Sequence, residues 1–68
     1  NWAWVYEENP GNWVQFECIY CMILESKWKL WKDTNPSISV RILVGQKLST
    51  IKFDKMIAEH KLKRSFKP

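Results

Sequence analysis

NWAWVYEENPGNWVQF, residues 1–16, is the stretch that decides the fold. Aromatic and small side chains alternate over residues 2–6, and this period of two is typical of a strand with one packed face. The triplet Asn9-Pro10-Gly11 is a strong turn signal, after which residues 13–16 return as a second strand. The sequence therefore predicts an N-terminal β-hairpin that is rich in tryptophan.

The hydrophobic period changes in residues 17–32. Ile19, Met22, Ile23 and Leu30 fall near the spacing of about 3.6 residues that an amphipathic helix requires. Lysines gather toward the end of this segment, where they complement the negative end of a helix dipole. A strand over residues 18–24 is the alternative, but the length of the segment favours a helix, which the dipeptide at 35–36 (Asn-Pro) ends.

Strand signals dominate the second half of the chain. Residues 37–44 (SISVRILV) alternate apolar and polar side chains, and Gly45-Gln46 turns the chain into another strand at 47–53. Residues 54–57 are expected to form a turn or a single helical turn, and a last strand is expected at 63–67. One helix packed on a curved, mostly antiparallel sheet is the α+β solution that this order favours.

Length and charge limit the possible functions. The 68 residues are enough for one domain, residues 1–68, and the absence of an initiator methionine suggests a domain excised from a larger protein. The longest apolar run, residues 18–24, is far shorter than the ~20 residues of a membrane span, so no membrane partner is expected. The net charge of +4 is uneven: residues 1–26 carry four glutamates and no base, whereas residues 45–68 carry seven bases and two acids.

Two cysteines, Cys18 and Cys21, form a single C-x-x-C pair, and His60 is the only other candidate metal ligand of this kind. A zinc site usually needs four ligands, and small secreted domains usually contain several disulfides. Structural burial of the thiols is therefore favoured over metal or redox chemistry. We expect no metal or cofactor, and a cytoplasmic or nuclear location.

Catalysis is not expected from this sequence. The chain lacks a glycine-rich phosphate loop, His60 has no evident nucleophile to activate, and the carboxylates are scattered. No catalytic residue is assigned. The basic residues toward the C-terminus are able to face a phosphate-bearing ligand, and single-stranded RNA is one hypothesis for that ligand.

A wider pattern joins these segments. Trp4 is followed by Trp13, by Phe16 three residues later and by Glu25 nine residues after that, and this spacing resembles the WWE domain, named for two tryptophans and a glutamate. Residues 50–56 (TIKFDKM) resemble the family segment T-I-D-F-x-x-M, and residues 64–67 (RSFK) resemble its closing R-x-I/V-R.

The resemblance implies a half-barrel of about six strands around one α-helix. It also implies a monomeric, non-catalytic module from a ubiquitin ligase or an ADP-ribosyltransferase, which binds ADP-ribose, poly(ADP-ribose) or an ADP-ribosylated protein. In such modules an aromatic side chain holds the adenine, while basic and amide side chains hold the phosphates. The ligand contacts carried over are Tyr6, Gln15, Lys63 and Arg64, and the framework residues are Trp4, Trp13, Glu25 and Met56.

Several positions depart from the family pattern. Val14 stands where poly(ADP-ribose) readers often have a second tryptophan, Ser49 replaces a tyrosine, and Ala58 replaces a glutamine. With these departures, the chain resembles the divergent WWE domains of mono-ADP-ribosyltransferases. The alternative hypothesis is therefore a WWE-fold scaffold without a working pocket, which serves protein–protein or interdomain contact through an exposed apolar patch that includes Trp31.

Overall fold

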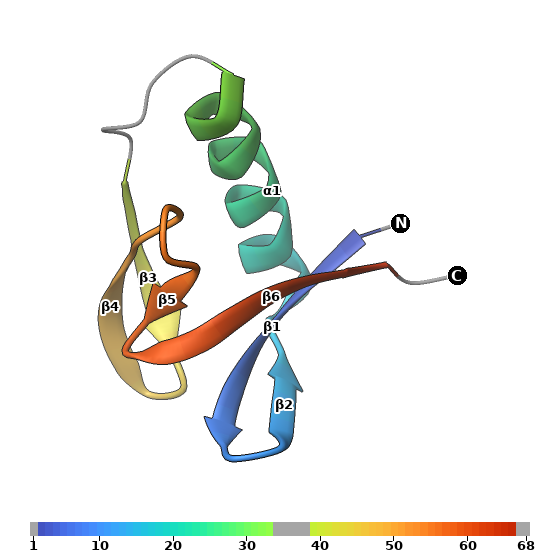
Figure 1. The fold of residues 1–68 in the computed structure, drawn as a ribbon, viewed down its shortest axis with the longest axis vertical. Helices are drawn as coiled ribbons and strands as arrows, with labels where there is room; N and C mark the ends of the chain where they lie inside the picture. The colour runs from blue at the N-terminus through green and yellow to red at the C-terminus, as the bar shows by residue number, and fades with distance from the viewer. Residues whose placement is uncertain (1, 34–38, 67–68) are drawn as a thin grey trace.

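The computed structural model describes residues 2–33 and 39–66 (Figure 1). In this part of the chain the elements are β1 (Trp2–Asn9), β2 (Asn12–Gln15), α1 (Cys18–Asp33), β3 (Val40–Val44), β4 (Lys47–Ile51), β5 (Ile57–Ala58) and β6 (His60–Phe66). All the strand pairs among them are antiparallel. The α+β class predicted from the sequence is confirmed.

The strands form two sheets. One has the order β2-β1-β6-β5, the other consists of β3 and β4, and an isolated bridge between Lys52 and Ile57 connects them. The central pairing of β1 with β6 brings the two ends of the described chain together, because Trp2 pairs with Phe66 (Figure 1). The half-barrel of about six strands stays a prediction, since the sheets are joined by that bridge rather than by a continuous ladder.

The N-terminal hairpin and the helix follow the sequence prediction closely. The turn between β1 and β2 contains Gly11 with a φ of 82°, a left-handed value that glycine adopts without strain. The helix starts one residue later than predicted, at Cys18, and its inner face buries Cys21 and Leu24 against the strands. Helix α1 packs on β1 and β3.

The second half of the chain is less regular than predicted. Residues 37 and 38 of the predicted third strand lie outside the described residues, and β3 begins at Val40. The short strand β5 was not predicted, and β6 starts at His60 rather than at residue 63. Met56 and Glu59 adopt positive φ values around β5, and these turns let so short a strand pair with β6.

The core is strongly aromatic. Trp4 is fully buried, and its ring meets Trp28 and Phe53 edge to face at centroid distances of 6.2 and 6.0 Å. Trp13, which we expected in the framework beside Trp4, is only half-buried and lies outside this core. The reason is strand parity: Trp13 pairs with Glu7, so it lies on the opposite face of the sheet from Tyr6.

Candidate functional site

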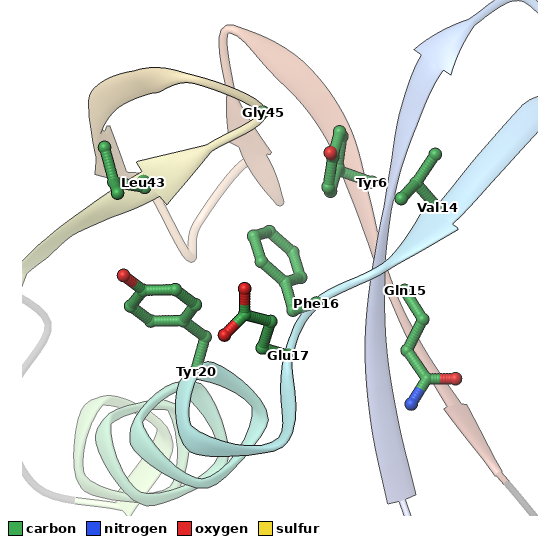
Figure 2. A pocket seen from close by; sticks show the side chains of 8 residues that line it. All are labelled: Tyr6, Val14, Gln15, Phe16, Glu17, Tyr20, Leu43 and Gly45. Carbon is green, nitrogen blue, oxygen red and sulfur yellow. The ribbon is translucent and has the colours of Figure 1, made fainter.

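A cavity of about 290 Å³ lies between β2, β3 and the start of α1 (Figure 2). Strand β2 pairs only with β1, and β3 pairs only with β4, among the described strands, so the cavity opens between two strand edges. Its lining residues are Tyr6, Val14, Gln15, Phe16, Glu17, Tyr20, Leu43 and Gly45.

Three aromatic residues line the cavity. Tyr6 from β1 and Phe16 after β2 are in contact, with their ring centroids 4.9 Å apart and their planes tilted by 53°. Tyr20 approaches from the first turn of α1, so the three rings face the cavity from three elements (Figure 2). Aromatic faces of this kind are suited to a flat heterocycle.

The course of the chain from β2 into α1 determines where Phe16, Glu17 and Tyr20 lie. The Phe16 amide donates a hydrogen bond of 2.9 Å to the Trp4 carbonyl, which holds the chain against β1. The next residue, Glu17, accepts the amide of Cys21 through its carbonyl at 2.9 Å and so starts α1. Within five residues the chain therefore passes from strand to helix, and it carries Phe16, Glu17 and Tyr20 around the cavity.

Among residues 2–33 and 39–66, Glu17 is the only charged residue that lines the cavity, and the lining contains no Lys or Arg. Glu17 directly precedes α1, and Tyr20 lies in the first turn of that helix. The polar groups offered to a ligand are therefore a carboxylate and tyrosine hydroxyls. Such groups accept hydrogen bonds from amino groups more readily than they bind phosphate.

Gln15, one of the predicted ligand contacts, lines the cavity without pointing into it. It pairs with Val5, whereas its neighbour Val14 pairs with Tyr6, so Gln15 and Tyr6 lie on opposite faces of the sheet. In Figure 2 the amide of Gln15 points away from the aromatic rings. Of the predicted contacts, Tyr6 alone presents its side chain to this space.

Arg64, a second predicted contact, is bound to Glu25 instead of lining the cavity. Its Nε donates to Glu25 Oε1 at 2.8 Å, and its Nη2 donates to Glu25 Oε2 in the same bidentate pair. The guanidinium also lies over Trp2 and Trp28, with its central carbon 3.9 and 4.4 Å from their ring centroids.

Glu25 accepts a further hydrogen bond of 2.9 Å from the indole Nε1 of Trp4. The hydrogen bond from Arg64 is the main cause that lowers the pKa of Glu25 below its ordinary value, and the bond from Trp4 lowers it further against the opposing effect of burial. The same bond raises the pKa of Arg64. Glu25 thus accepts a buried indole donor, which is the framework role expected for it.

Lys63 and Met56 also lie away from the cavity. The Lys63 ammonium sits 4.4 Å from the ring centroid of Trp13, on the outer face of the sheet. Met56 is half-buried and packs against the core. Of the four predicted contacts, Tyr6 and Gln15 line the cavity, but only the Tyr6 side chain faces it, and neither Arg64 nor Lys63 is among its lining residues.

Phe16, Glu17 and Tyr20 were not predicted as site residues. In the sequence Phe16 and Tyr20 fit the strand and helix patterns, which give no sign that they share a cavity with Tyr6. The one available signal is the dense aromatic spacing across the strand-to-helix junction.

The remaining chemistry of the described residues is sparse. Both cysteines are free: Cys18 is exposed, and Cys21 is buried with its thiol 3.4 Å from the Phe16 carbonyl. No group of three or more His, Cys, Asp and Glu side chains within residues 2–33 and 39–66 is arranged to hold a metal ion. In the same residues no helix has the length and apolar character needed to cross a membrane.

Comparison with known proteins gives one family. Searches among curated proteins and among solved structures found no match. The family model of the WWE domain matches residues 2–66, nearly the whole chain, and so includes Trp4, Trp13, Glu25 and the cavity. The chain therefore belongs to the WWE domain family, a family of interaction modules rather than of catalytic domains.

Proposed function

We propose that this WWE domain is a non-catalytic module that recognises ADP-ribose units, either terminal or within poly(ADP-ribose), as part of an ADP-ribosylation or ubiquitin-ligation protein. The observation that carries the proposal is the cavity lined by Tyr6, Phe16 and Tyr20 in a chain that matches the WWE family. A volume of about 290 Å³ is at the small end of ligand sites, which measure roughly 300–1,000 Å³. It suits the adenine end of such a ligand better than the whole molecule.

The lining residues favour adenine over phosphate. The exocyclic amino group of adenine donates hydrogen bonds, and a carboxylate such as that of Glu17, which lines the cavity, accepts them. Because none of the described residues that line the cavity is a lysine or arginine, we expect the pyrophosphate to remain in solvent and to add little affinity. Adenosine is then expected to bind almost as tightly as ADP-ribose.

An NMR titration of the labelled domain with ADP-ribose, iso-ADP-ribose, ATP and a short RNA tests the proposal. ADP-ribose is expected to shift the amide resonances of Tyr6, Phe16 and Tyr20. Tyr20→Ala is expected to weaken binding at least about fivefold, because stacking of a base on a ring contributes about 1–3 kcal/mol. The matched control Tyr20→Phe keeps the ring and is expected to keep most of the affinity. No shift at millimolar ligand would rule the proposal out.

The scaffold alternative depends on exposed apolar side chains. Trp31, which we expected in such a patch, is instead half-buried and lies against Phe53, with their ring centroids 6.1 Å apart. The most exposed large apolar side chains near the chain ends and on α1 are Ile19, Met22 and Phe66. A domain that acts only as a scaffold is expected to show no response to any of the nucleotides while these side chains contact a protein.

A further inference from the structure

A second hollow runs along α1 on the side away from the aromatic cavity. This groove has a volume of about 650 Å³ and shares no lining residue with the cavity at Tyr6. Its lining residues are Trp2, Cys18, Cys21, Met22, Glu25, Ser26 and Lys29, and we refer to it as the Trp2 groove.

The helix wall of the Trp2 groove spans three turns. Cys18, Met22, Ser26 and Lys29 recur at intervals of three or four residues, so they share one face of α1. At a rise of 1.5 Å per residue, the segment from residue 18 to residue 29 is about 17 Å long. Met22, in the middle of it, is 64% exposed. A linear wall of this length, with an exposed methionine at its middle and a lysine at one end, matches one face of a short amphipathic helix.

Trp2 forms the opposite wall and is held in place although it is 47% exposed. Its ring contacts Phe66 edge to face at 5.2 Å, and the Arg64 guanidinium lies on it at 3.9 Å. Arg64 is itself fixed by its bidentate bond to Glu25. An exposed tryptophan that is already ordered loses little conformational entropy on binding, which is the property of an interface hot spot.

The charge of the groove indicates the nature of its partner. The Glu25 carboxylate is neutralised by Arg64, and Lys29 lies 3.9 Å from it with a side chain that is 61% exposed. Counting Arg64 and Lys29 against Glu25 leaves one positive charge at this end of the groove. Among the lining residues Glu25 is the only acid, so a carboxylate of a partner would meet Lys29 without opposition from another lining acid.

We propose that the Trp2 groove is a docking site for an acidic amphipathic helix of a partner protein. Apolar side chains one turn apart on that helix contact Trp2 and Met22, and a glutamate or aspartate beside them pairs with Lys29. Packing of one helix into a groove along another is a common mode of peptide recognition.

A pair of synthetic helical peptides tests this assignment. Both carry leucines on one face, and the first has glutamates beside them where the second has lysines. Titrated into the labelled domain, the glutamate peptide is expected to shift the Trp2 indole and Met22 methyl resonances and to bind at least about fivefold more tightly than the lysine peptide.

Two substitutions with matched controls separate the groove from general effects. Met22→Ser is expected to weaken binding of the glutamate peptide at least about fivefold. Leu48→Ser, which changes a 51% exposed leucine on β4, is expected to leave its affinity unchanged. Lys29→Glu is expected to reverse the preference toward the lysine peptide, whereas Lys27→Glu, outside the groove lining, preserves the original order.

Equal binding of the two peptides, or an unchanged preference in Lys29→Glu, overturns the acidic-helix assignment. Sedimentation of the domain alone tests whether a second copy of this chain occupies the groove. A dimer that Met22→Ser dissociates would identify a second copy of this chain as the ligand and would also overturn the proposal. The result is independent of ADP-ribose binding, since Met22→Ser leaves the cavity at Tyr6 intact.

Discussion

At the scale of single residues, Glu25 connects three parts of the chain through one carboxylate. It accepts the Trp4 indole from β1 and the Arg64 guanidinium from β6, and it lies on α1. Its side chain is only 20% exposed, so hydrogen bonds replace most of the water that ionisation requires. The charge on Glu25 is therefore a structural element of the fold.

The lowered pKa of Glu25 makes stability depend on pH. A carboxyl whose pKa is lower in the folded state stabilises the fold above its unfolded pKa, and this contribution is lost as pH falls through the folded pKa. We expect urea-unfolding curves to show a loss of about 1.5–3 kcal/mol from this group on acidification, the range for hydrogen bonds to charged groups. Glu25→Gln should remove that part of the pH dependence, and Glu8→Gln, on an exposed residue, should retain it. Parallel pH profiles for the wild type and Glu25→Gln would contradict this account.

At the scale of elements, the β3–β4 hairpin depends on one backbone conformation. Val44 pairs with Lys47, so the loop consists of Gly45 and Gln46. Gly45 has a φ of 67°, a positive value of the kind that two-residue hairpin loops need at their first position, and an added Cβ there would meet no atom within 4 Å. The requirement for glycine at this position is conformational and does not arise from crowding.

This distinction predicts which substitutions at residue 45 lower the free energy of unfolding more. Gly45→Ala is expected to lower the free energy of unfolding by about 1–2 kcal/mol, because a Cβ is unfavourable in the left-handed region. Gly45→Asn should cost less, since asparagine tolerates that region better. Denaturant unfolding of both variants measures the difference. Equal losses would indicate that contacts of the turn, rather than its φ angle, limit stability.

At the scale of the whole molecule, aromatic packing joins the helix to both sheets. Phe53 follows β4 and is 3% exposed, and its ring lies 6.0 Å from Trp4 and 6.1 Å from Trp31. It therefore contacts β1 and α1 from the segment that connects the two sheets. For a domain of 68 residues, a total stability of about 3–10 kcal/mol is usual.

Removal of the Phe53 ring is expected to unfold much of the population. Phe→Ala changes in cores cost about 3–5 kcal/mol, which approaches the whole stability expected here. Phe53→Leu preserves more of the volume and should stay folded with a lower melting temperature. Far-UV circular dichroism and amide NMR dispersion distinguish the two outcomes. A cooperative, native-like melt for Phe53→Ala would show that the sheets and helix do not depend on this contact.

The local elements of this protein were determined by the sequence alone. Alternation over residues 2–6, the Asn9-Pro10-Gly11 turn and the helical period over residues 17–32 act between near neighbours, so they predict β1, β2 and α1 to within a few residues. The order of these elements and of the strands after them indicated the α+β class. Strand β5 was not predicted because two residues are too few to show a period.

The positions of the site residues were decided only by the tertiary structure. Arg64 and Glu25 are 39 positions apart, and the pairing of β1 with β6 over α1 brings them together, which takes Arg64 away from the cavity. Pairing parity likewise directs Gln15 to the face opposite Tyr6. The sequence determines which segments become strands and helix because those preferences are local; register and packing, which are long-range, determine which side chains meet.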